Sequence, residues 1–152
     1  MTPDVNVLIA ASRSDHPNHK IAFGVLNEAV AACADGASLK LMPMIAASFL
    51  RLVTNPKIFV RPTPVEDAID FVDSLVAVSG VEIPSLGAEW PIFRQLCMEK
   101  QLTANAIPDA WLAAVVIQLG EHLVTFDADF KNLLGRTQVT VLNPRRGIRG
   151  GG

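Results

Sequence analysis

Two carboxylates, Asp109 and Asp127, are the residues whose type and spacing could perform chemistry together. Asp109 opens a largely apolar segment over 109–119, which predicts a helix about 16 Å long at ~1.5 Å per residue. Residues 122–126 predict a strand of similar length, about 16 Å at ~3.3 Å per residue. If the strand doubles back along the helix, the two carboxylates meet and repel each other. A hard cation such as Mg²⁺, which takes oxygen ligands, would relieve that repulsion.

The segment that carries these acids has its own start and stop signals. Pro108 is predicted at the first helical position, because its missing N–H has no partner there. Gly120 is predicted to end the helix, and residues 123–126 read as a short buried strand. Taken singly, each acid has a simpler interpretation, Asp109 as an acid of the first helical turn and Asp127 as a turn residue.

The rest of the chain alternates helical periodicity with short apolar runs. Further helices are predicted over 20–34, 43–53, 65–78 and 90–100, and further strands over 39–42, 81–83 and 139–142. Short strands separated by helices predict an α/β fold with a parallel sheet covered on both faces. Ligands gather at the carboxyl ends of such strands. Asp127 follows one of these ends, so the fold argument agrees with the length argument.

Composition limits the class of protein. The 152 residues fit one domain with a sizeable core, and no apolar run approaches the ~20 residues of a membrane-spanning helix. We see no export signal, and two cysteines, Cys33 and Cys97, are typical of buried thiols in a reducing cytoplasm. The net charge of −2 does not indicate a nucleic-acid-binding surface by itself. Half of the residues are hydrophobic, which favours a partner that covers apolar surface and predicts a homodimer.

Several short motifs carry a resemblance to a known family. In chain order they are DVNVL at 4–8, HPNH at 16–19, FLRLVTNP at 49–56, Asn105 with PDA at 108–110, and TFDADF at 125–130. Together they resemble the PIN-domain ribonucleases, and specifically the VapC toxins of bacterial toxin–antitoxin pairs. The resemblance covers nearly the whole chain. It implies a single PIN-like domain over 1–143, with a central short-stranded parallel sheet between layers of helices, and residues 144–152 read as a flexible basic tail.

The resemblance also implies a chemistry, which is metal-dependent cleavage of RNA phosphodiester bonds. Asp4, Asp109 and Asp127 would be catalytic and would bind Mg²⁺ or Mn²⁺, with Asp129 helping. The metal would activate a water and neutralise charge on the phosphate. Asn6, Asn105 and Thr125 would orient the carboxylates or contact the substrate, with a local hydrogen bond to the backbone as the alternative for each. The implied partners are an RNA substrate and a cognate VapB-type antitoxin.

One position departs from the family pattern. These enzymes commonly carry a glutamate just before the Phe-Leu-Arg run, where this chain has Ser48. A serine could hold a metal-bound water but supplies no negative charge, so metal affinity should fall. Arg51, in the same run, is interpreted either as a structural residue or as a contact to RNA.

The resemblance changes one prediction of local structure. The first Asp of the family closes strand one and a helix begins at once, so Asp4 would end a short strand at 1–3 and residues 6–11 would be helical. Composition alone favours a buried strand over 5–11, which is the competing interpretation.

Other residues suggest weaker alternatives. His16, His19 and His122 are too few and too irregularly spaced for a zinc site, and Trp90 and Trp111 are more typical of core or interface than of base-stacking platforms. Three functions remain open: an RNA-cleaving toxin, a PIN-like domain that binds RNA or protein without cutting, and a metal-dependent phosphatase or nuclease that acts on DNA.

Overall fold

A parallel three-stranded sheet lies at the centre of the computed structural model, which describes residues 1–143. Its strands are β1 (Thr2–Pro3), β4 (Leu123–Thr125) and β5 (Val139–Val141), in the order β1-β4-β5. A second parallel pair joins β2 (Leu39–Lys40) to β3 (Val81–Glu82). The basic tail predicted for 144–152 lies outside the described residues.

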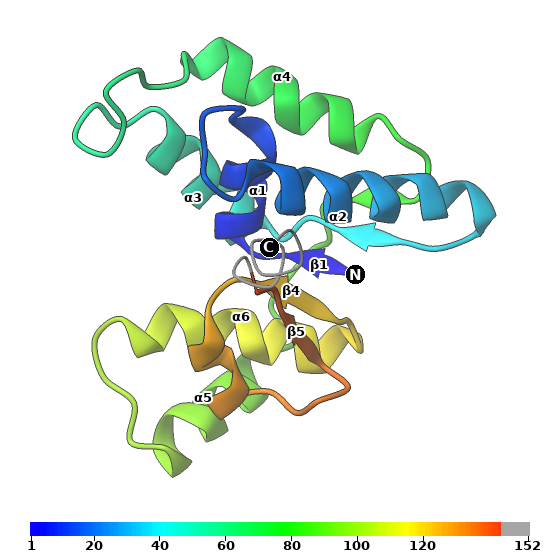
Figure 1. Cartoon of the computed structure of the whole chain (residues 1–152). Helices are drawn as coiled ribbons and strands as arrows, with labels where there is room; N and C mark the ends of the chain where they lie inside the picture. The colour runs from blue at the N-terminus through cyan, green and yellow to red at the C-terminus, as the bar shows by residue number, and fades with distance from the viewer. Residues whose placement is uncertain (144–152) are drawn as a thin grey trace, which may run out of the picture.

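Helices cover the central sheet on two sides, as Figure 1 shows. One side carries α1 (Val5–Ser12), α2 (His19–Ala32), α3 (Pro43–Val53) and α4 (Val65–Val76). The other side carries α5 (Trp90–Glu99) and α6 (Ala106–Leu119). Two short 3-10 helices, η1 (Cys33–Asp35) and η2 (Ala128–Asn132), complete the elements. The predicted α/β fold with a short-stranded parallel sheet between helices is therefore confirmed.

The start of the chain decides between the two predictions for residues 5–11. The strand expected from composition is wrong, because Val5–Ser12 is the helix α1. Five consecutive residues of this helix, Val7 to Ala11, are buried, so the helix is packed on nearly every side and its apolar residues show no helical period. The short strand before it, β1, tolerates a proline because the N–H groups of Thr2 and Asp4, on either side of Pro3, donate to the carbonyls of His122 and Val124.

The helix that carries Asp109 begins earlier than predicted. α6 starts at Ala106 rather than at Pro108, so Pro108 occupies the third position of the first turn. Its missing N–H is harmless there, because the first four N–H groups of a helix have no partner within it. The predicted stop is confirmed, since Gly120 adopts the left-handed conformation with φ of 63°.

Within the described range 1–143, no helix has the length and hydropathy needed to cross a membrane. The main core instead gathers around α1, which packs against α2, α3 and β4. A smaller cluster joins Phe93 of α5 to Ala110 and Ala114 of α6. The sheet and the buried α1 thus hold the first residues of the chain at the centre of the molecule, where Asp4 lies.

Candidate functional site

Asp4 is held at the carboxyl edge of the sheet by two hydrogen bonds. The register pairs Pro3 with Val124, so Asp4 and Thr125 follow side by side at the ends of β1 and β4. One carboxylate oxygen, Oδ1, accepts the N–H of Val5 at 2.7 Å, and Oδ2 accepts the Thr125 hydroxyl at 2.7 Å. Burial raises the pKa of Asp4, the two hydrogen bonds oppose that rise, and the charge of Asp127 adds to it. The fold therefore fixes the direction of this carboxylate.

Thr125 and Asn6 tie the loop after β4 to the first helix. The Thr125 Oγ1 accepts hydrogen bonds from Asn6 Nδ2 at 3.3 Å and from the backbone N–H of Asp127 at 3.0 Å. The Asn6 Oδ1 accepts the N–H of Phe126 at 3.2 Å. These bonds fix the start of the turn that presents Asp127 and Asp129, as expected for residues that orient carboxylates.

Asp109 lies in the first turn of α6 and is electrostatically coupled to the other acids. Burial raises the pKa of Asp109, and the charges of Asp127, Asp4 and Asp129 raise it further. Within residues 1–143 no hydrogen-bond donor reaches its carboxylate. The structure thus brings together four acids, Asp4, Asp109, Asp127 and Asp129, which we call the acidic cluster.

Asp127 and Asp129 belong to one local turn. Asp127 caps η2 by accepting the N–H of Asp129 on Oδ1 at 2.9 Å. This capping is the turn role that is also available to a lone aspartate. Its remaining oxygen is free for a further ligand, so the two roles are compatible.

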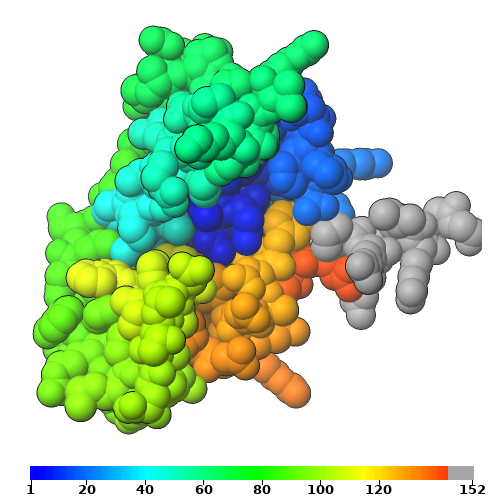
Figure 2. Space-filling view, turned by 90° about the vertical axis from the view of Figure 1, so that its left-hand side faces the viewer, coloured from blue at the N-terminus to red at the C-terminus, as the bar shows by residue number. Residues whose placement is uncertain are grey.

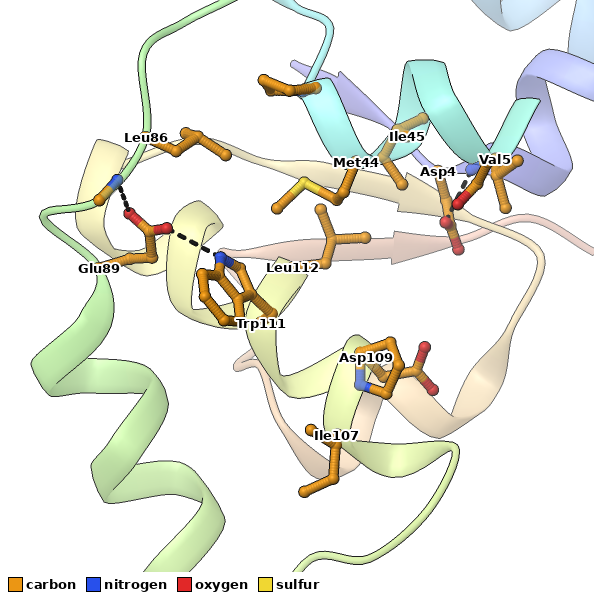
Figure 3. A pocket seen from close by; sticks show the side chains of 14 residues that line it. Asp4, Val5, Met44, Ile45, Leu86, Glu89, Ile107, Asp109, Trp111 and Leu112 are labelled. Carbon is orange, nitrogen blue, oxygen red and sulfur yellow. Dashed lines mark hydrogen bonds between the residues drawn. The ribbon is translucent and has the colours of Figure 1, made fainter. Parts of the chain in front are cut away.

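A cavity of about 610 Å³ borders the acidic cluster. Figure 3 shows the carboxylates of Asp4 and Asp109 at one end and Glu89 with Trp111 at the other. Ser48, which stands where the family has a glutamate, also lines this cavity from α3. In Figure 2 the first residues, in dark blue, are visible between the cyan and green segments above and the yellow and orange segments below.

The donor set of the acidic cluster fits a hard divalent cation. All four side chains offer oxygen, and their mutual repulsion favours a positive charge among them. Among residues 1–143, no group of three or more His, Cys, Asp or Glu side chains is already arranged to hold a metal ion. Mg²⁺ usually keeps several waters and needs only one or two direct carboxylates. The residues present therefore suit a hydrated Mg²⁺ better than a fully dehydrated metal site.

The remaining candidates are not among the residues that line the cavity. Asn105 is exposed beside the start of α6, and Arg51 is exposed in the last turn of α3. His16 accepts a backbone N–H from Asn18, His19 contacts the Ala10 carbonyl, and His122 contacts Thr137 and Thr140. Each histidine therefore has a separate local partner.

Glu89 is a buried acid that the sequence analysis did not single out. It is only 2 % exposed and accepts the N–H of Gly87 at 2.7 Å and the indole N–H of Trp111 at 2.8 Å. Burial disfavours its charged form, but backbone and indole donors outweigh that cost and lower the pKa of Glu89. In the sequence Glu89 is an acid just before a predicted helix, which is a common arrangement. Its position therefore gave no indication of a functional role.

Comparison with known proteins gives two kinds of similarity. The family model described as the PIN domain matches residues 1–134. The chain is 38% identical over 128 residues to "Ribonuclease VapC25" of Mycobacterium tuberculosis, covering 84% of this chain and 88% of that protein. It is 37% identical over 130 residues to "Ribonuclease VapC31" of the same species, again covering 84% and 88%.

A solved structure is similar in fold. It is VapBC2 from Rickettsia felis bound to a DNA fragment from their promoter, with a TM-score of 0.61 and 15% sequence identity. The match covers 93% of this chain and 98% of that one. At this identity the similarity concerns the fold alone.

Proposed function

This chain belongs to the PIN-domain family, and we propose that it is the toxin of a toxin–antitoxin pair, a Mg²⁺- or Mn²⁺-dependent endoribonuclease. The observation that carries the proposal is the acidic cluster, in which Asp109 feels the charges of Asp4, Asp127 and Asp129. Relatives at 37–38% identity are named ribonucleases, which supports RNA as the substrate. Mutual repulsion at the edge of a sheet is destabilising without a cation, so a metal-dependent hydrolase explains why these acids are together.

In this proposal Asp4, Asp109 and Asp127 hold the metal, and Asp129 assists them. When bound, the ion supplies an activated water and neutralises charge on the phosphate that is attacked. Thr125 keeps the Asp4 carboxylate in a fixed direction, and Asn6 keeps the turn before Asp127 in place.

Three further residues have roles in this proposal besides the four acids. Ser48 lines the cavity, and its hydroxyl would bond a water of a hydrated ion. Asn105 and Arg51 are exposed near the ends of α6 and α3, from which they contact the RNA backbone. The positive charge of Arg51 suits contact with a phosphate of the RNA backbone.

Ser48 also favours a second candidate function, which is RNA or protein binding without cleavage. The position lines the cavity beside Asp4 and Asp109 but adds no negative charge. If the remaining acids bind metal too weakly, the chain keeps the shape of the family and loses its chemistry. Titration with Mg²⁺ and Mn²⁺ by calorimetry separates the two, because only the enzyme requires metal binding.

Cleavage of defined oligonucleotides tests the main proposal. We expect the purified chain to cut single-stranded RNA in Mg²⁺ or Mn²⁺, to leave DNA of the same sequence intact, and to be inactive in EDTA. Cleavage of DNA instead would favour the third function, a DNA nuclease or phosphatase. Cleavage of RNA that persists in EDTA would contradict the metal-dependent mechanism.

The proposed partners have their own tests. A cognate VapB-type antitoxin should suppress the growth arrest that follows induction of this chain in the cytoplasm, and Asp4→Ala should abolish the arrest.

We also propose a homodimer that buries apolar helix surface, because Val65, Ile69 and Val76 of α4 are exposed. Light scattering of the chain without antitoxin should give twice the monomer mass, and a monomer at micromolar concentration would contradict the dimer.

A further inference from the structure

Trp111 shares a cavity with the acidic cluster. It lies two residues after Asp109 on α6, and Figure 3 shows it beside Glu89 at the end away from Asp4. Its side chain is 36% exposed, so of the two roles that the sequence suggested, core or interface, the first does not apply. An accessible indole beside a nuclease site offers a flat apolar surface to whatever enters the cavity.

The indole of Trp111 is fixed in place before any ligand arrives. Its N–H donates to Glu89 Oε1 at 2.8 Å, and Glu89 is itself bonded to the Gly87 N–H. The ring centre of Phe93 lies 4.7 Å from that of Trp111, and the ring centre of Trp90 lies 6.2 Å away. A ring held in this way loses little freedom on binding, which favours affinity.

The charges along the cavity decide what kind of group fits beside Trp111. Among residues 1–143, the charged side chains that line it are Asp4, Asp109 and Glu89, and all three are acidic. A phosphate beside Trp111 would therefore meet no cation. The other lining residues at this end are apolar and include Met44, Leu86 and Leu112, so an uncharged, planar group suits the space.

We propose that Trp111 forms a nucleobase subsite, in which an unpaired base of the RNA stacks on the indole while a neighbouring phosphate lies at the cation that Asp4 and Asp109 would hold. This inference rests on the proposed ribonuclease function. Stacking tolerates every base because each has a flat aromatic face. The subsite therefore selects single-stranded RNA over paired RNA without selecting a sequence, and Glu89 acts as its positioning residue.

Fluorescence tests the subsite directly, because the chain has only two tryptophans. Trp90→Phe leaves Trp111 as the sole emitter, and Trp111→Phe leaves Trp90, which is 52% exposed and outside the described cavity lining. Both variants also carry Asp127→Asn, so that RNA binds without being cut. Titration with a short single-stranded RNA should quench Trp111 strongly and should quench Trp90, whose ring centre lies 6.2 Å from that of Trp111, markedly less. Equal quenching of both, or no quenching while filter binding detects the complex, would overturn the subsite.

Kinetics supply a second readout. Trp111→Leu should raise KM for single-stranded RNA by about 10-fold to 100-fold with a smaller change in kcat, and Trp111→Phe should recover most of the loss because it keeps a ring. Phe23→Leu, at an exposed aromatic ring of α2 outside the described cavity lining, is the matched control and should keep the KM of the original chain. Circular dichroism checks that each variant is folded, and Trp111→Phe carries the test if Trp111→Leu is not.

An RNA that lacks one base locates the stacked position. An abasic ribose moved along the substrate should raise KM at one position for the original chain and leave the KM of Trp111→Leu unchanged there. If both proteins respond alike at every position, no base stacks on Trp111 and the inference is wrong. Loss of antitoxin binding with unchanged RNA kinetics in Trp111→Leu would assign the cavity to a protein segment instead. If the original chain neither binds nor cuts RNA, the proposed function itself fails, which is a distinct result.

Discussion

Asp4 and Asp109 line one cavity, but the protein holds them in opposite ways. Asp4 is 6% exposed, and both of its oxygens accept hydrogen bonds from Val5 and Thr125. Asp109 stands in the first turn of α6, and no donor among residues 1–143 reaches its carboxylate. Burial raises the pKa of both, but three neighbouring carboxylates act on Asp109 whereas one acts on Asp4.

The comparison separates what each carboxylate does for the stability of the fold from what it does in the proposed reaction. Asp4 belongs to the hydrogen-bond network at the carboxyl edge of the sheet. Both the fold and the proposed chemistry therefore depend on Asp4. Asp109 costs stability through repulsion and gains a favourable partner only when a cation binds. Changes at the two positions should therefore lower activity alike and move stability in opposite directions.

The largest expected effect comes from removing either charge. Asp4→Ala and Asp109→Asn should each lower RNA cleavage by at least ~100-fold, because each removes a proposed metal ligand. Asp4→Ala should also cost about 1–3 kcal/mol of unfolding free energy, since buried donors lose their acceptor. Asp109→Asn should leave the metal-free protein as stable or more stable. Cleavage rates and urea unfolding measure both, and a marked loss of stability in Asp109→Asn would contradict the contrast.

A smaller effect is expected at Thr125, which supports Asp4 without binding metal. Thr125→Val keeps the shape of the side chain but removes the hydroxyl that Asp4, Asn6 and Asp127 share. We expect cleavage to fall by about 10-fold to 100-fold and stability by about 1–3 kcal/mol. Thr137→Val, at an exposed site, is the matched control. Equal behaviour of the two variants would mean that Asp4 needs no orientation.

Ser48 offers a change that should increase metal binding. Ser48→Glu places a carboxylate in the cavity near Asp4 and Asp109, where it should tighten Mn²⁺ binding by about 10-fold, the lower end of what supporting residues contribute. The added repulsion should lower the stability of the metal-free chain. The adjacent exposed Ala47 gives the control Ala47→Glu. Calorimetry measures the Mn²⁺ affinity of both variants. An equal gain in affinity in Ala47→Glu would show that any added negative charge on this helix has the same effect.

The smallest effect is the pH dependence of stability without metal. The pKa of Asp109 is raised above its ordinary value of 3.8, so the folded chain holds a proton that the unfolded chain has released. The original chain should thus lose stability relative to Asp109→Asn as pH rises from 3.8 through the raised pKa. Below pH 3.8 the two should converge, because the carboxyl is then neutral in both states. Urea unfolding of both chains across this range provides the measurement. A difference in unfolding free energy between the two chains that grows toward low pH would contradict the predicted direction.

The sequence carried much of the fold because its signals were local. The long apolar run of α6 between Pro108 and Gly120 and the short strand after it are readable from adjacent residues. The helix α1 was hidden from composition, since it is buried on nearly every side, and only the resemblance to the PIN-domain family predicted it. That same resemblance brought Asp4 to the site, because no local pattern links residue 4 to residue 125.

The sequence did not predict contacts between residues that lie far apart along the chain and belong to no motif. Glu89 resembles any acid at the start of a helix, and Trp111 resembles any aromatic residue in an apolar one. Their hydrogen bond, 22 positions apart, depends on how α5 and α6 pack. Sequence motifs therefore predicted the acidic end of the cavity, whereas only the tertiary structure revealed the aromatic end.

Binding of Mn²⁺ to the original chain and to Asp109→Asn tests the central claim most directly. If the acidic cluster holds a divalent ion, calorimetry should detect about one Mn²⁺ per chain in the original protein, with competition by Mg²⁺. Asp109→Asn should bind far more weakly while remaining folded. Unchanged Mn²⁺ affinity in this variant, or RNA cleavage that survives complete removal of metal, would contradict the account.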